Sequence, residues 1–196
     1  GYSHTTMSNP PGSYFIPNED RKEFFDLYYK HVFIDKLPAH VTEAPDKIDV
    51  SPLKVDIDLR YVGDEIKRHY TQDLLKKIIE VHHQEIDKWL VTPLSEEEKL
   101  CFVFEKPSPV YDTKNGKIKT DKCGKNIIKD GIHLFWPYII TPCAFHYKVR
   151  DYVVNYFKSN NIFKSIGVTN TINEIFDMHI INRINWLMYG SSKPSK

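Results

Sequence analysis

The feature that most constrains the fold is the segment Val55–Leu59, which reads Val-Asp-Ile-Asp-Leu. Successive side chains of a β-strand point to opposite faces of the sheet. The three apolar residues of the segment therefore share a face that can enter a core, while Asp56 and Asp58 share the other face. The alternation predicts a strand over residues 54–61 that carries two neighbouring carboxylates.

Two carboxylates on one face repel each other unless a cation or water compensates their charge. Mg²⁺ prefers oxygen ligands, and substrate phosphates often complete its coordination shell. Polymerases use such carboxylates to hold two metal ions for in-line displacement at phosphorus. Asp56 and Asp58 are therefore candidate metal ligands; the alternative is an ordinary strand whose outer face is simply solvated.

A second strand is predicted over residues 131–140, beginning near the sequence Lys-Asp-Gly-Ile-His-Leu-Phe-Trp. By the same alternation, Lys129, Gly131 and His133 lie on one side. The glycine allows a bulky ligand to approach the backbone, and a lysine and a histidine suit a triphosphate. The alternative for His133 is a histidine whose hydrogen bonds are satisfied within the fold.

The C-terminal part offers a third carboxylate and a possible phosphate site. Asp177 ends an apolar segment, and a two-metal site would need one further acidic ligand. Gly190 allows a tight bend, after which Ser192 and Lys193 could bind phosphate. Asp177 could instead be a capping or turn residue.

The remaining pattern indicates a mixture of helices and strands, hence an α+β or mixed α/β fold. Apolar periodicity predicts helices over residues 19–36, 64–90 and 146–159. Apolar runs predict a buried strand over 101–104 and a strand over 172–176, and no internal repeat is found. Asn115-Gly116 predicts a turn inside the lysine-rich segment 114–129, which we call the lysine-rich excursion.

Composition excludes some classes of protein. The 196 residues are 41% hydrophobic, enough for one domain or two small lobes that share a core. No apolar run approaches the roughly 18 residues that a membrane span needs. Three scattered cysteines do not form a disulfide framework and suggest a reducing compartment, and we predict no zinc site.

The net charge is +1, so the distribution of charge matters more than its total. The excursion carries Lys117, Lys119, Lys122 and Lys125 just before the histidine strand. These lysines could grip the backbone of a nucleic-acid template; a solvated loop is the alternative.

Together, the order of the three segments resembles the motifs of the archaeo-eukaryotic primase (AEP) superfamily. The order is Asp-x-Asp, then Lys-x-Gly-x-His on a strand, then an apolar-Asp pair followed by Asn-Trp-Leu-Met-Tyr-Gly-Ser-Ser-Lys. It is most similar to the PrimPol-like branch at the front of primase–helicases of nucleocytoplasmic large DNA viruses of the mimivirus type. The resemblance covers nearly the whole chain.

The resemblance implies an N-terminal αβ unit packed on an RRM-like sheet, with the site between them. It implies one catalytic domain over residues 1–196, in two sub-lobes that divide near residues 95–125, cut from a longer protein. Asp56, Asp58 and Asp177 would hold two Mg²⁺ or Mn²⁺ ions. Bound nucleotide would be contacted by Lys129, Gly131, His133, Ser192 and Lys193.

Two positions depart from the pattern of the superfamily. Many relatives have Ser where this chain has Gly131, so one hydroxyl donor to phosphate is missing. PrimPol relatives often place an Arg near Leu187, where this chain is apolar. The groups that balance the triphosphate charge thus differ from those that the superfamily pattern implies.

The expected activity is primer synthesis from NTPs or dNTPs on single-stranded DNA, with a helicase downstream in the same polypeptide. The expected location is intracellular, at a cytoplasmic viral replication site without membrane attachment. Two alternatives stay open: a non-catalytic module that binds single-stranded nucleic acid, and a metal-dependent nuclease or phosphoesterase.

Overall fold

The computed structural model describes residues 1–8, 10–44, 49–181 and 184–194, which divide into two compact units. The first unit combines both ends of the chain, residues 1–49 and 182–196, and the second unit is the continuous segment 50–181. The predicted division near residues 95–125 does not coincide with these units, because that stretch lies within the second one.

The first unit is a small antiparallel sheet with one helix. Its sheet has the order β11-β3-β1-β2. Its helix α1 covers Arg21–Tyr29 and continues as a π-helical turn over Lys30–Ile34, which confirms the helix expected in this region. The strands are β1 (His4–Thr6), β2 (Gly12–Tyr14), β3 (Val41–Glu43) and β11 (Trp186–Leu187).

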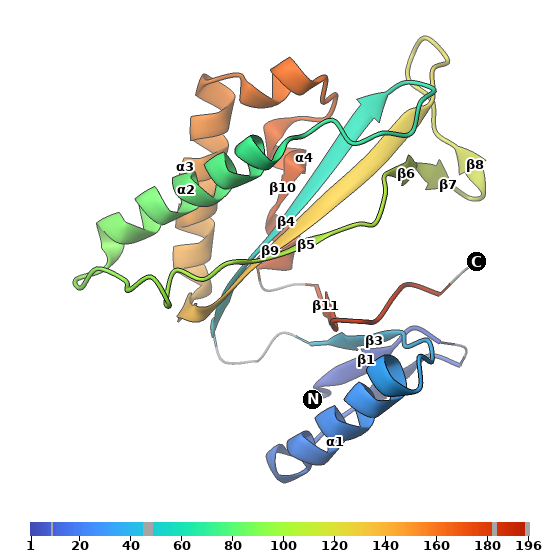
Figure 1. Cartoon of the computed structure of the whole chain (residues 1–196), viewed down its shortest axis with the longest axis vertical. Helices are drawn as coiled ribbons and strands as arrows, with labels where there is room; N and C mark the ends of the chain where they lie inside the picture. Colours follow the sequence, from blue (N-terminus) through green and yellow to red (C-terminus); the bar gives the residue numbers. More distant parts are fainter. Residues whose placement is uncertain (9, 45–48, 182–183, 195–196) are drawn as a thin grey trace. The chain divides into compact units, whose positions relative to one another are not determined.

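The second unit is organised by two long antiparallel strands, β4 (Val50–Val62) and β9 (Ile127–Pro142). Figure 1 shows them as the long cyan and yellow ribbons. The sheet has the order β10-β4-β9-β5, and the short strand β6 also pairs with β9. The other strands are β5 (Phe102–Glu105), β6 (Val110–Tyr111), β7 (Thr113–Lys114), β8 (Lys117–Ile118) and β10 (Phe176–Asp177).

One face of this sheet forms the hydrophobic core. Ile57 and Leu59 of β4 and Leu134 and Trp136 of β9 are fully buried there, as the alternation of the sequence predicts. Helices α2 (Gln72–Trp89) and α3 (Cys143–Ser159) contribute their apolar residues to the same core. The even-numbered residues of β4 therefore lie on the opposite face. The mixture of helices with antiparallel sheets confirms the α+β class.

The start predicted for the second helix, near residue 64, is wrong. Helix α2 begins at Gln72, and Thr71 is extended and accepts a hydrogen bond from the backbone N–H of Leu74. Such an N-cap satisfies one of the free N–H groups of the first turn. Ile66, which lies within the predicted range 64–90, is 44% exposed, because residues before the cap are not helical.

The predicted strand over residues 172–176 is mostly helical. Helix α4 covers Ile172–Ile175, and only Phe176–Asp177 forms strand β10. A capping box explains the difference: Thr171 and Glu174 bind each other's backbone N–H groups. These bonds favour a helical turn over an extended segment.

The strand predicted over residues 101–104 exists, but it is not buried. Strand β5 pairs only with β9, and Phe102 is 46% exposed. The apolar run instead supplies an edge strand. The predicted turn at Asn115–Gly116 is confirmed, since both residues have positive φ (53° and 75°) between β7 and β8. Among the described residues, no helix is both long and apolar enough to cross a membrane.

Replacing Thr171 by Ala should lower the free energy of unfolding by about 1 kcal/mol, because the N-cap of α4 is lost. Chemical denaturation followed by circular dichroism measures this. Thr113→Ala in the exposed strand β7 is the matched control and should change the stability by only a few tenths of that amount. Equal losses in both variants would contradict a capping role.

Candidate active site

The pairing of β4 with β9 brings the first two predicted motifs together. Asp56 lies opposite His133, and Asp58 lies opposite Gly131. All four positions are on the face of the sheet away from α2 and α3, because their neighbours in sequence are in the core. The predicted acidic strand and histidine strand thus form one surface.

Asp177 joins the same surface through β10, where it pairs with Asp56. Arg150 of α3 holds this short strand, since its guanidinium donates to the carbonyl oxygens of Phe176 (2.8 Å) and Asn173 (3.0 Å). The register therefore creates one row across the sheet, Asp177–Asp56–His133, which we call the Asp56 row.

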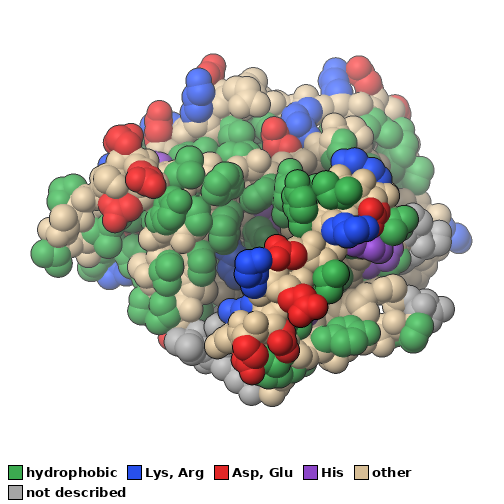
Figure 2. Space-filling model, turned by 60° about the horizontal axis from the view of Figure 1, so that its bottom comes forward, with side chains coloured by type: hydrophobic (Ala, Val, Ile, Leu, Met, Phe, Trp, Pro, Cys, Tyr) green, Lys and Arg blue, Asp and Glu red, His purple; other side chains and the backbone are tan. Residues whose placement is uncertain are grey.

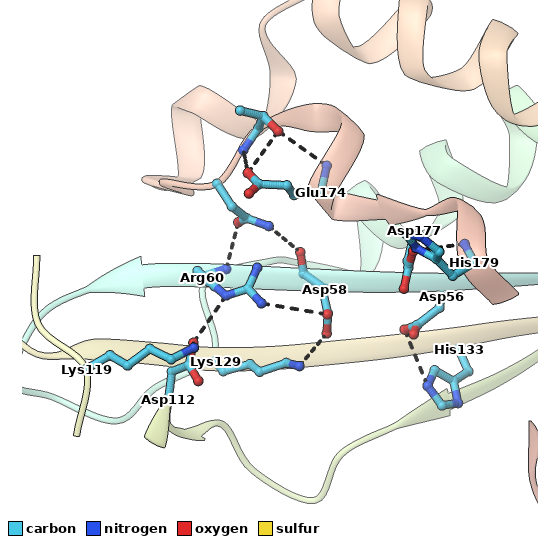
Figure 3. A network of polar contacts seen from close by, with 12 residues as sticks. Asp56, Asp58, Arg60, Asp112, Lys119, Lys129, His133, Glu174, Asp177 and His179 are labelled. Carbon is cyan, nitrogen blue, oxygen red and sulfur yellow. Dashed lines mark hydrogen bonds and ion pairs between the residues drawn. The ribbon is translucent and has the colours of Figure 1, made fainter. Parts of the chain in front are cut away.

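Each of the three carboxylates faces a cationic or hydrogen-bonding side chain (Figure 3). Asp58 pairs with Lys129 at 3.0 Å, and Asp56 lies 3.4 Å from the Nε2 atom of His133. Asp177 is 2.7 Å from the Nδ1 atom of His179. The three carboxylate side chains keep exposed fractions of 23%, 22% and 29% for Asp56, Asp58 and Asp177, so solutes can reach them.

The environment of Asp177 favours the ionised form of its side chain. Burial raises its pKa, but hydrogen bonds from the backbone and ring of His179 outweigh burial, so that the pKa lies below its usual value. A carboxylate that is ionised in this way is ready to ligate a cation.

The donor set fits a divalent cation in kind and in register. Three carboxylates on adjacent strand positions supply the hard oxygen ligands that Mg²⁺ and Mn²⁺ prefer. In the described part of the chain, no three His, Cys, Asp or Glu side chains are gathered closely enough to hold a metal. To share one ion, the three carboxylates would have to lie closer together than they do in this structure.

The predicted phosphate-binding residues fall into two groups. Three of them lie on β9, beside the carboxylates of β4: Lys129, Gly131 and His133. Ser192 and Lys193 belong to the first unit, where the Nδ1 atom of His40 is 2.6 Å from the carbonyl oxygen of Ser192. Their predicted role at the nucleotide therefore stays a prediction.

Lys106 also lies at this surface, although the sequence analysis did not single it out. It directly follows β5, whose residue Glu105 pairs with Ile132. A Cβ atom added to Gly131 would lie 3.5 Å from both the Cε and Nζ atoms of Lys106. Gly131 is buried on this otherwise accessible face, and the lysine side chain lies over it.

The backbone of Lys106 is held by a second group that the sequence did not reveal. Arg68 donates to the Lys106 carbonyl oxygen (2.6 Å) and pairs with the fully buried Asp130 (3.0 Å) and with Glu105 (3.2 Å). The hydroxyl of Tyr70 donates to Glu105 (2.6 Å). This network, which we call the Arg68 network, ties the end of β5 to β9.

Burial lowers the pKa of Lys106, and repulsion by Lys129 lowers it further, against the attraction of Asp58, Asp130 and Asp56. The ammonium of Lys106 is therefore within electrostatic reach of the carboxylates. The only signal in the sequence is a single lysine before Pro107-Ser108-Pro109, which follows no pattern.

The lysine-rich excursion contains one lysine that is already engaged. Lys119 and Arg60 both pair with Asp112, at 2.9 and 3.3 Å, and these two cations hold the pKa of Asp112 down against its burial. The side chains of Lys117, Lys122 and Lys125 are exposed. On the face drawn in Figure 2, acidic and basic side chains are interspersed.

Comparison with known proteins identifies the fold family. The family model described as "C962R protein N-terminal AEP domain" matches residues 3–196. The chain is 29% identical over 191 residues to the candidate helicase L207/L206 of Acanthamoeba polyphaga mimivirus, covering 97% of this chain and 18% of that protein.

Two further relatives come from invertebrate iridescent viruses. The chain is 24% identical over 204 residues to the candidate helicase 184R of virus 6, and 26% identical over 205 residues to the candidate helicase 121R of virus 3. Each alignment covers 98% of this chain and 20% of the relative. The chain thus spans about a fifth of the length of the curated relatives it matches.

Proposed function

Because the chain belongs to this AEP family, we propose that it is a primase that makes primers on single-stranded DNA from nucleoside triphosphates. The observation that carries the proposal is the Asp56 row, together with Asp58 and Lys129 beside it. A binding module for an anionic polymer gains nothing from three clustered carboxylates. A nuclease would not need the cationic surface of Lys129 and His133.

In this proposal Asp56, Asp58 and Asp177 hold two divalent cations. Such ions favour ionisation of the attacking 3′-hydroxyl and stabilise the charge of the leaving pyrophosphate. Lys129 and His133 would contact the triphosphate and orient it for in-line attack. Ser192 and Lys193 stay predicted phosphate-binding residues.

The relatives are named as helicases and are about five times as long as this chain, which supports a helicase part within the same polypeptide. We expect both units of residues 1–196 to act as one catalytic domain. The expected place of action is the viral replication site in the infected cell, and dNTPs as well as NTPs are candidate substrates.

Synthesis on unprimed single-stranded DNA tests the proposal. Labelled NTPs or dNTPs are supplied with Mg²⁺ or Mn²⁺, and the wild type is compared with the Asp56→Ala/Asp58→Ala variant. Short products from the wild type alone, with release of pyrophosphate, are expected. DNA binding without products and without metal-dependent nucleotide binding would favour a non-catalytic module, and cleavage of the DNA would favour a nuclease.

The lysine-rich excursion is a candidate site for binding the backbone of the template. Replacing Lys117, Lys122 and Lys125 by Ala should reduce the slope of log K against log salt by about 2, since each contact with a single strand contributes roughly 0.7. Fluorescence anisotropy with a labelled oligonucleotide at several salt concentrations measures the slope. Lys119 is left intact because it pairs with Asp112.

A matched control replaces three exposed lysines elsewhere in the second unit, Lys76, Lys158 and Lys164. This control removes the same charge and should leave the slope close to that of the wild type. An unchanged slope in the excursion variant would mean that the excursion is a solvated loop.

A further inference from the structure

The open face of the sheet carries a second cross-strand row beside the Asp56 row. Asp58 of β4 lies opposite Gly131 of β9. Glu105 pairs with Ile132, so extending the register by one residue places Lys106 beside Gly131. We call Asp58, Gly131 and Lys106 the Asp58 row.

The Lys106 side chain lies over Gly131, at ordinary contact distance from the place where a Cβ atom would stand. Its Nζ atom would lie 3.5 Å from an added Cβ atom, and the carbonyl oxygen of Ile57 would lie at 3.4 Å. A Cβ atom alone would fit there, whereas a longer side chain that extends toward Lys106 would compete with the lysine for space. Glycine at this position lets the lysine side chain lie over the backbone of β9.

Lys106 differs from the other cations of this surface in having no acidic partner. Lys129 pairs with Asp58, and Arg60 pairs with Asp112. Among the described residues, no carboxylate lies within ion-pair distance of Lys106. A half-buried ammonium that makes no direct ion pair is only partly compensated, so an anion that binds there gains both Coulombic attraction and hydrogen bonds.

The position of Lys106 is also fixed by its backbone. The hydrogen bond from Arg68 to the Lys106 carbonyl oxygen connects it to the buried Asp130. A cation on a fixed backbone loses less conformational entropy when it binds a ligand than one on a mobile loop. This is the arrangement expected of a binding residue.

We infer that Lys106 binds the triphosphate of the incoming nucleotide, over Gly131 and beside the metal-binding carboxylates. The inference rests on the proposed function, which supplies the ligand class. Lys106 delivers to the phosphates, from the edge strand β5, a donor that residue 131 lacks.

Equilibrium binding of ATP in the presence of Mg²⁺ tests the inference with three proteins: the wild type, Lys106→Met and Lys76→Met. Methionine retains an apolar stem of similar length and removes the charge. Lys106→Met should weaken ATP binding about 10- to 100-fold, as expected for one charge-assisted hydrogen bond. Lys76 is exposed on α2, which packs on the core face, and its variant should bind like the wild type.

Two further measurements separate phosphate recognition from structural damage. Inorganic tripolyphosphate, which has no base or sugar, should lose the same factor of affinity in Lys106→Met. The thermal midpoint of this variant should equal or exceed that of the wild type, because a half-buried charge that makes no direct ion pair is removed.

The outcomes distinguish the inference from the proposed function. ATP binding that is equal in the wild type and Lys106→Met overturns the role of Lys106 alone, whereas a wild type that binds no ATP overturns both. The assignment of Lys106 to the triphosphate would be overturned by any of three results. They are an equal loss of ATP affinity in Lys76→Met, an unchanged affinity of Lys106→Met for tripolyphosphate, and a lowered thermal midpoint of Lys106→Met.

Discussion

Primer synthesis should fall at least about a thousandfold when Asp56 is replaced by Asn, which corresponds to roughly 4 kcal/mol of lost transition-state stabilisation. Asp56 occupies the centre of its row, between Asp177 on β10 and His133 on β9. Asparagine has nearly the same shape but no negative charge, so the sheet should remain folded while the affinity for the divalent cation is lost.

Two measurements accompany the rate. Binding of Mn²⁺, followed by its paramagnetic effect on water relaxation, should weaken in parallel with activity. Asp26→Asn is the matched control: Asp26 is exposed on α1 and pairs with the exposed Lys22, so both readouts should be unchanged. Near-full activity in Asp56→Asn would refute the assignment of the three carboxylates as metal ligands.

The second large effect is on stability. Arg68→Met should lower the free energy of unfolding by about 3 kcal/mol or more, because Asp130 has no exposed surface and would keep a buried charge without its cationic partner. Urea denaturation of the purified protein measures this change. Lys67→Met, which breaks an exposed pair with Glu65, should barely shift the midpoint.

A double variant identifies the cause of this loss. If the unpaired charge of Asp130 is responsible, Arg68→Met/Asp130→Asn should be more stable than Arg68→Met alone, although it carries one more substitution. If the double variant is less stable still, the guanidinium contributes mainly through its contacts with Glu105 and the Lys106 carbonyl oxygen.

The two central strands could be predicted from sequence because their patterns are local. Alternation at Val55–Leu59 requires one apolar and one acidic face in any strand, and the structure has that arrangement. The start of α2 and the helix α4 differ from the prediction because local hydrogen bonds decide them: the side chains of Thr71 and Thr171 accept from backbone N–H groups of the first helical turns. Such bonds compete with the periodicity of apolar residues and can override it.

The register between strands could not be predicted, because it depends on how side chains far apart in sequence pack. Nothing local indicates that Asp56 meets His133 rather than a neighbouring residue of β9. Asp130 shows the same limit: alternation places it on the core face, and its ion-pair partner Arg68 lies 62 residues earlier in the sequence. Lys106 is significant only because β5 carries it to Gly131.

The order of the two units along the chain determines which of them can be produced as a separate polypeptide. Residues 50–181 form one uninterrupted stretch that includes the core, the three carboxylates, Lys106 and the Arg68 network. One uninterrupted coding segment can therefore encode the second unit with its three carboxylates, without the first unit. The first unit joins residues 1–49 to 182–196, and β11 pairs with β3, so its separate production would require a genetic splice across residues 49 and 182.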